Sequence, residues 1–544
     1  MEAPEIDHTV SGDPEVSPKQ YMTGMRLWLA GSGLAMSVFL PSVEVSIVST
    51  SLVTITNEFQ SYEKISWVVT AYLIAYTGFL VIWSKLCDIV GLKPTLGMAM
   101  IIFIAFSAGC GAATSMDQLI IFRALQGMGG AGVYSITTIG FIQMVPPSFY
   151  TQITAVASSL MSLGLILGPL LGGAINQDGQ WRWVFYMNLP AGALGLIVCL
   201  LAFPNHFPNH IRETTGMREK EGFLGWDLHM LRKVDVVGAM LLLGASVLLV
   251  TALEEGDVHF AWESAAIICF FVISGILWAA FIAWQWYVSR GSLHVEPMFP
   301  WRFFRNRTWM GTLFGCFVSG APITIAVIGL PQRYQIVNLN SPLDAGVKLL
   351  AYAAATPVGV VLASLATGKI RIPFVYVLLV GCALQTTGFA LLSTLPVGLD
   401  TWPGQHGYSV LTGLGTGCTI GTLYMLAPIS VDKKDQALAI GTGLQLRMLG
   451  GAVGIAAANS KFNSYLHTKL PGLLQDYQLS AVLHSASSIA ALPLDLQTRV
   501  REVYGEAYNW QMRVTIGFAA AAFLTVPLIW KKQPLRLGLD GTPE

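Results

Sequence analysis

The sequence predicts an all-α polytopic membrane protein with fourteen transmembrane helices. Of its 544 residues, 53% are hydrophobic and only 11% are charged, whereas a soluble domain carries about 25% charged residues. The mean hydropathy is +0.59, and apolar stretches of the ~20 residues needed to cross a ~30 Å hydrocarbon layer recur along the chain. The formal net charge is zero, so nothing indicates a nucleic-acid partner, and we expect none.

Most of the fourteen predicted spans follow one another with short connections, and the longest loops are 204–233 and 459–508. The spans lie at about 27–56, 65–83, 95–113, 118–142, 150–175, 184–203, 234–253, 263–287, 308–331, 343–367, 372–395, 407–430, 436–458 and 509–530.

Two glycine-rich segments of the first part of the chain recur in the second part. Gln126–Gly132 in the fourth span is echoed by Thr412–Cys418 in the twelfth, and Leu171–Ala174 in the fifth by Leu449–Ala452 in the thirteenth. Because both echoes keep the same order and nearly the same offset, they indicate two related halves of six helices.

The repeat divides the chain into five parts. We expect a disordered tail, an N-terminal half, a loop with two extra helices, a C-terminal half with a long outer loop at 459–508, and a second tail. Their ranges are 1–25, 26–203, 204–307, 308–530 and 531–544.

The positions of Lys and Arg predict the orientation. With the N-terminus inside, 20 of the 31 Lys and Arg residues fall in inner segments and 7 in outer ones, so both termini are expected in the cytoplasm. The acidic stretch Glu254–Asp257 then falls in an outer loop. In the loop 459–508, the spacing of Leu479, Val482 and Leu483 fits either a short amphipathic helix at the membrane rim or a solvated loop.

Few reactive or ionisable side chains lie in the predicted spans. The seven cysteines show no paired or metal-ligand spacing, so we expect neither a disulfide nor a metal or other cofactor. The ionisable residues placed deep in the spans are Glu44, Arg123 and Arg447. Such residues are costly in a membrane unless they are partnered or functional.

Glu44 is the main candidate for proton coupling. Removal from water favours the neutral form of a carboxyl, whereas a neighbouring cation favours the charged form, so the two together allow a proton to bind and leave. Arg123 is the expected partner, and Gln126 lies one turn further along the same helix face. The alternative is a purely structural Glu44–Arg123 pair that fixes helix packing.

The fifth span carries a face without side chains. Gly164, Gly168 and Gly172 recur every four residues, Pro169 removes one backbone hydrogen bond, and Gly173 follows. A small-residue face permits close helix contact, and the proline permits a kink. We expect this segment to be a moving contact between the two halves.

These motifs resemble the major facilitator superfamily, in its branch of fourteen-span drug:proton antiporters. The run Gly164–Gly173 is similar to that branch's antiporter motif. The series Arg123, Gln126 and Gly127 is similar to its fourth-span motif, whose arginine is linked to proton transfer. The sequence as a whole is similar to fungal toxin and multidrug efflux pumps.

A third segment resembles the family's gating motif between the second and third spans. Asp88, Gly91 and Lys93 match that motif, whereas Ser84, Ile89 and Leu92 replace one glycine and two arginines. The resemblance implies an interdomain latch with fewer cations than usual.

The resemblance implies that two six-helix halves rock about a central cavity and exchange a small-molecule substrate for protons. Hydrophobic or amphiphilic substrates are expected, with cavity candidates Tyr72, Tyr134, Gln332, Tyr352, Tyr424, Gln445 and Arg447. We expect a monomer in the plasma membrane, with the vacuolar membrane as the alternative. The rival function is proton-coupled transport of a siderophore or amino acid. The chain shows neither the polar cluster of a membrane enzyme nor a sizeable signalling domain.

Overall fold

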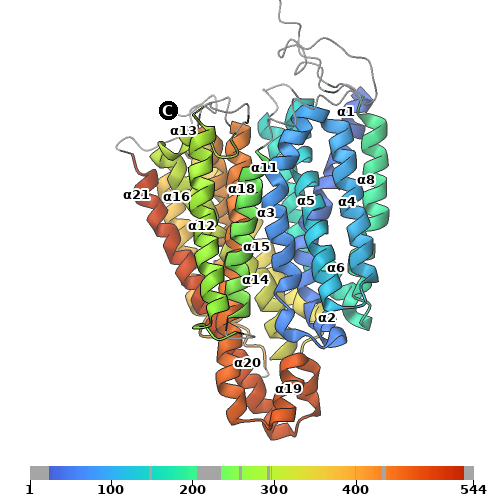
Figure 1. Ribbon diagram of the computed structural model, residues 1–544, viewed down its shortest axis with the longest axis vertical. Coiled ribbons are helices and arrows are strands. Elements are labelled where there is room, and N and C mark those ends of the chain that lie inside the picture. The colour runs from blue at the N-terminus through green and yellow to red at the C-terminus, as the bar shows by residue number, and fades with distance from the viewer. Residues whose placement is uncertain are drawn as a thin grey trace, which may run out of the picture.

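The fold is a bundle of long helices that run along one axis (Figure 1). It is seen in a computed structural model that describes residues 22, 24–145, 150–204, 207, 235–256, 260–290, 295, 297–398, 400–431 and 436–531. Thirteen helices of this part are long and apolar enough to cross a membrane. With α6, a helix of 26 residues, the bundle has fourteen, as predicted.

The first half is built from six long helices. They are α1 (Gly24–Ile47), α3 (Trp67–Val90), α4 (Leu92–Ala112), α5 (Met116–Met144), α6 (Tyr150–Ile175) and α8 (Asn188–Ala202). Short helices continue or connect them: α2 (Leu52–Phe59) after the turn Val48–Thr50, and α7 (Arg182–Tyr186).

The second half repeats this plan after an inserted pair. The inserted helices are α11 (Val236–Glu255) and α12 (Ala265–Val288). The second half comprises α14 (Arg307–Ile336), α15 (Pro342–Gly368), α16 (Phe374–Leu392), α17 (Gln405–Ile429), α18 (Gln436–Lys469) and α20 (Leu494–Ala521). The short helices here are α13 (Trp301–Phe304), α19 (Asp476–His484) and α21 (Thr525–Ile529).

Polar residues fix where several of these helices begin. The Ser115 hydroxyl accepts a hydrogen bond from the Gln118 amide at the start of α5, and the Asn306 side chain accepts one from Trp309 at the start of α14. Asp235 does the same for Gly238 at the start of α11. Each cap satisfies an N–H group that would otherwise lack a partner at a helix terminus.

Equivalent close approaches occur in the two halves. A methyl group placed on Gly127 of α5 would come within 3.0 Å of the Tyr72 backbone in α3, and one on Gly413 of α17 within 2.6 Å of the Tyr352 carbonyl oxygen in α15. The same residue types therefore pack the same helix pair twice, which supports the internal repeat inferred from the glycine segments.

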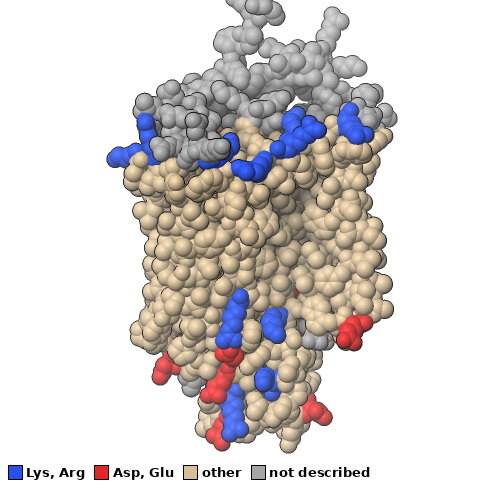
Figure 2. All heavy atoms as spheres, turned by 90° about the vertical axis from the view of Figure 1, so that its left-hand side faces the viewer, with Lys and Arg blue, Asp and Glu red and all other residues tan. Residues whose placement is uncertain are grey.

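The two ends of the bundle differ. α1 begins and α21 ends on one side, here called the termini side, whereas α19 lies on the opposite side, the α19 side (Figure 1). Lys and Arg side chains line the termini side, whereas the α19 side carries both acidic and basic side chains (Figure 2). The exposed cations of the termini side include Arg26, Arg290, Arg302, Arg305, Arg307, Lys369 and Lys531.

The long outer loop is mostly helical. α18 continues to Lys469 and α20 starts at Leu494, so both extend well beyond the predicted spans. Between them α19 forms, with Val482 buried, and Ile489 is also buried. Leu494 is exposed. Val482 and Ile489 belong to the main hydrophobic core of the bundle, which rules out the solvated-loop alternative.

Candidate functional site

The candidate site centres on a buried ion pair between α1 and α5. Arg123 Nη1 lies 2.5 Å from Glu44 Oε1, and the two side chains are 1% and 0% exposed. Ionised groups at this depth require each other, since removing one partner leaves an uncompensated buried charge. The structure thus brings together the two residues predicted to act in proton coupling.

Two further hydrogen bonds and a ring contact hold the Arg123 guanidinium. Its Nε donates to the carbonyl oxygen of Val68 in α3 at 2.9 Å, and its Nη1 also donates to Gln126 Oε1 at 2.7 Å. The guanidinium carbon lies 4.4 Å from the centre of the Tyr72 ring, a cation–π contact. Arg123 therefore keeps three neutral partners whatever the charge on Glu44.

Two polar residues without a predicted role complete the network. Asn188 Nδ2, at the start of α8, donates to Glu44 Oε2 at 2.6 Å. Gln126 Nε2 donates to the Ser107 hydroxyl of α4 at 2.8 Å. The carboxylate therefore has a donor on each oxygen, and helices α1, α3, α4, α5 and α8 meet at one polar cluster. Donors to a carboxylate stabilise its charged form.

The glycine face of α6 contacts α1 and not the other half, which corrects its predicted interdomain position. A methyl group on Gly164 would meet Ser42 Cβ at 2.9 Å, and one on Gly168 would collide with the Ser46 hydroxyl. Gly172 likewise faces the Ile47 carbonyl oxygen. Ser46 itself donates a hydrogen bond to the Gly164 carbonyl oxygen at 3.2 Å. The face lets α6 approach the helix that carries Glu44.

The neighbouring residues of the same motif do reach the other half. A methyl group on Gly173 would come within 2.7 Å of the Pro342 carbonyl oxygen at the start of α15, and one on Gly346 of α15 would collide with the Pro169 carbonyl oxygen. Pro169 and Gly173 therefore form the contact between halves that was expected of the whole motif. Helix α6 therefore packs against both α1 and α15.

The two halves meet from mid-depth to the α19 side. Gln445 Nε2 of α18 donates to the Thr77 carbonyl oxygen of α3 at 2.8 Å, and the hydroxyls of Tyr62 and Tyr508 lie 3.0 Å apart. Gln335 donates to the Thr50 carbonyl oxygen at 3.0 Å. These bonds close the α19 side of the interface between the halves.

Three cavity candidates gather at this interface. Tyr134 of α5, Tyr424 of α17 and Arg447 of α18 are partly exposed. The Arg447 guanidinium lies 5.8 Å from the centre of the Tyr424 ring. The Tyr134 ring lies 6.2 Å from that of Tyr76 in α3, tilted by 58°, and Tyr76 was not among the predicted cavity residues. Aromatic faces and one cation from both halves suit an amphiphilic ligand.

The remaining cavity candidates are packed. Tyr72 lies against Arg123, and Tyr352 is fully buried in the second half. Gln332 lies on the α19 side, 3.5 Å from the Tyr508 hydroxyl, and Gln445 is 2% exposed and holds the bond to Thr77. These four side chains hold helices together.

The gating motif is only partly described. The side chain of Asp88 lies outside the described part of the structure. Gly91 joins α3 to α4 with φ +96°, a conformation that favours glycine, and its carbonyl oxygen accepts a hydrogen bond from the Thr95 hydroxyl at 2.7 Å. Lys93 is half-buried in the first turn of α4.

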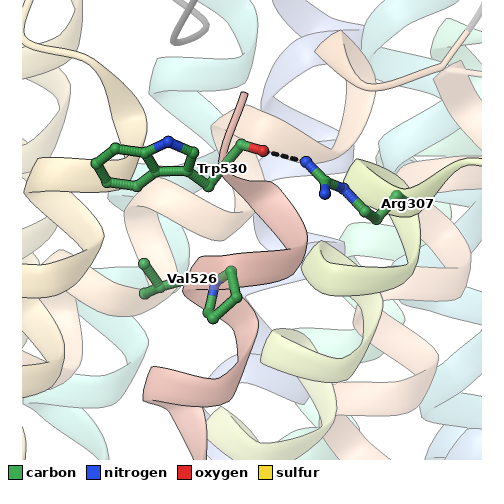
Figure 3. A pocket seen from close by; sticks show the side chains of 4 residues that line it. Arg307, Val526 and Trp530 are labelled. Carbon is green, nitrogen blue, oxygen red and sulfur yellow. Dashed lines mark hydrogen bonds between the residues drawn. The ribbon is translucent and has the colours of Figure 1, made fainter. Parts of the chain in front are cut away.

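A surface pocket on the termini side has a structural role. Arg307, Val526, Pro527 and Trp530 line it (Figure 3). The Arg307 guanidinium donates to the Trp530 carbonyl oxygen just after α21, where a cation compensates unsatisfied carbonyls. In the part of the chain that the structure describes, no cluster of His, Cys, Asp and Glu has a metal-binding arrangement.

Known proteins match this chain along most of its length. The family model of the Major Facilitator Superfamily matches residues 34–455. The MFS-type transporter FPY5 of Fusarium mangiferae is 40% identical over 526 residues, 96% of this chain and 87% of that protein. Efflux pump mlcE of Penicillium citrinum is 30% identical over 97% of this chain and 94% of its own. The Dehydrocurvularin exporter of Aspergillus terreus is 30% identical over 86% and 81%.

Solved structures share the fold at low identity. A bacterial homolog to the human lysosomal transporter Spinster, inward-facing and occupied, superposes with a TM-score of 0.63 at 14% identity, over 94% of this chain and 99% of that one. The family match, the related sequences and the shared fold confirm the resemblance seen in the motifs: the chain belongs to the major facilitator superfamily of membrane transporters.

Proposed function

We propose that this protein exports hydrophobic or amphiphilic small molecules in exchange for protons by alternating access. The observation that carries the proposal is the fully buried Glu44–Arg123 pair in a bundle of two related halves. A buried carboxylate that binds a proton loses its attraction for the cation, so protonation changes the forces between α1 and α5.

The network around the pair supports a proton switch. When Glu44 is neutral, Arg123 retains the Val68 carbonyl, Gln126 and the Tyr72 ring. The Arg123 cation therefore keeps its partners, and α1 is the helix that loses its attraction to α5. Because α6 packs on α1 through Gly164 and Gly168 and on α15 through Gly173, a shift of α1 is transmitted to the interface between halves.

The charge distribution supports a cytoplasmic termini side. Lys and Arg line that end (Figure 2), as the positive-inside preference requires. The halves are joined on the α19 side, so this arrangement faces the cytoplasm. In the plasma membrane, a protein with this orientation binds its substrate from the cytoplasm. A proton that binds from outside then returns the transporter to the cytoplasm-facing state.

The interface between the halves supports an amphiphilic substrate. Tyr134, Tyr424 and Arg447 offer two aromatic faces and a cation. Relatives at 30% identity or more are named as an efflux pump and an exporter. The interface therefore favours export of an organic molecule over uptake of a cationic amino acid. All the residues of this site lie in one chain, so we expect a monomer to be sufficient.

The proposal is tested in cells and then in vesicles. Deletion and overexpression are scored against a panel of fungal secondary metabolites, with the intracellular amount of each compound measured. We expect deletion to raise and overexpression to lower the accumulation of at least one compound. Unchanged accumulation of every compound would contradict export.

A further inference from the structure

Glu254 occupies a position that its sequence context does not predict. The acidic stretch was expected to be a loop, yet Glu254 lies in the last turn of α11 and is 4% exposed. α11 packs against both α3 of the first half and α18 of the second, and Figure 1 shows it between them. The inserted helix pair thus lies over the interface between the halves.

The Glu254 carboxyl joins three parts of the molecule. Its Oε2 accepts a hydrogen bond from the Ser66 hydroxyl, just before α3, at 2.5 Å, and one from Asn459 Nδ2 of α18 at 3.3 Å. Asn459 also donates to the Ser66 hydroxyl at 3.1 Å. One carboxyl oxygen therefore links the inserted pair, the first half and the second half at the closed α19 side.

Among the residues that the structure describes around Glu254, no cation pairs with its carboxyl. Of the charged groups nearby, Lys64 is paired with Asp117 at 2.7 Å, and Lys461 lies 5.1 Å from the Trp510 ring. Glu255 on the same helix adds negative charge, and α12 contributes neither a carboxylate nor a basic group.

The second carboxyl oxygen of Glu254 is also unmatched. Oε1 is buried and has no hydrogen-bond partner among the described residues. An unpaired buried charge is strongly unfavourable. A proton on the carboxyl removes that charge and leaves the bonds to Ser66 and Asn459 in place. When α3 and α18 separate, water reaches the carboxyl and its ionised form is no longer penalised.

We propose that Glu254 is a second proton-binding site, separate from Glu44, at which a proton from the α19 side holds that side of the transporter closed. The inserted helix pair carries this group and so acts as a pH-dependent clamp on the α3–α18 contact. Closure binds a proton and opening releases it, so acid favours the closed state and rising pH opens it. The inference rests on the alternating-access cycle proposed above.

The test measures the α19-side opening directly. The full-length protein carries spin labels on cysteines at Ala112 of α4 and Val347 of α15, in a background where the exposed Cys269 is replaced by Ser, and is held in lipid nanodiscs. Pulsed electron resonance then gives the distance distribution between pH 5 and pH 8. We expect the ratio of long to short distances to rise by about tenfold or more across this range, as one titrating group allows.

Three variants separate the causes. Glu254→Gln keeps the acceptor for Ser66 and carries no charge, so it should hold the short distance at every pH. Glu44→Gln should retain the pH response of the distance. Ser66→Ala, which removes one donor, should favour the long distance and keep its pH dependence.

Two outcomes would overturn the inference. One is a Glu254→Gln protein whose distances respond to pH as the parent's do, and the other is loss of the response in Glu44→Gln alone. The readout needs no substrate, so a transporter that exports none of the panel compounds would still give a decisive distance measurement.

Discussion

Asn188 and Arg123 bind the two oxygens of the same carboxylate, Glu44, from two different helices, α8 and α5. Asn188 Nδ2 lies 2.6 Å from Oε2, and Arg123 Nη1 lies 2.5 Å from Oε1. The arginine supplies charge and the asparagine supplies a neutral donor. The two contributions can therefore be separated by substitution.

Substitution of Asn188 tests the neutral donor. A hydrogen bond to a charged group is worth about 1.5–3 kcal/mol, which corresponds to about 1–2 pH units. Its loss in Asn188→Ala makes the charged carboxylate less favourable, so proton release needs a higher pH. We expect the pH profile of proton-driven transport to move toward higher pH by about one unit. An unchanged profile would show that Asn188 does not act on the proton.

The α1–α6 contact predicts a packing defect. A methyl group at Gly168 collides with the Ser46 hydroxyl, and overpacking of this kind costs about 1–3 kcal/mol. Gly168→Ala should lower the thermal midpoint of the purified protein. Gly275→Ala in α12 is the matched control because a methyl group there meets nothing within 4 Å. Equal midpoints for both variants would contradict this contact.

The contact between Gly173 and α15 predicts a shift of conformation. A leucine at position 173 has no room beside Pro342 and Leu343, whose atoms lie 2.7 and 2.8 Å from the point that its Cβ would occupy. Gly173→Leu should separate the halves on the α19 side. Labelling of a cysteine placed at Thr50, buried in this structure, should then become at least several times faster. An unchanged labelling rate would contradict a role of Gly173 in the contact that moves between the halves.

The partly exposed cluster predicts a change in substrate affinity. Arg447→Gln removes the cation above the Tyr424 ring and leaves the Glu44 network intact. We expect the apparent KM for an anionic or aromatic exported compound to rise by about tenfold, with a smaller effect on the maximal rate. A selective fall in the maximal rate would indicate a role in the conformational cycle instead.

Some of this arrangement could be predicted from the sequence because it depends on single spans. Glu44 and Arg123 are opposite charges placed deep in apolar segments, and such groups rarely lie apart. The small-residue face of α6 is visible from the spacing of its glycines alone. The number of helices follows from apolar length.

Other features depend on contacts between distant segments, which one sequence does not encode visibly. The spacing of Gly164, Gly168 and Gly172 shows a bare face but not that α1 covers it. Asn188 follows the aromatic segment 181–186, which is typical of an anchor at the membrane interface. Glu254 follows an apolar run and precedes other acids, which is typical of a loop, yet packing against α3 and α18 extends the helix and buries it.

The central claim is that proton binding at Glu44 drives export, and substitution of Glu44 tests it most directly. Inside-out membrane vesicles are prepared with an imposed pH gradient, and uptake of an exported compound is measured for the parent, Glu44→Gln and Glu44→Asp, with Gly275→Ala as the control. We predict that Glu44→Gln loses gradient-driven uptake by about tenfold or more, that Glu44→Asp keeps a measurable part, and that the control matches the parent. Uptake by Glu44→Gln against the gradient at the parent's rate would contradict the account.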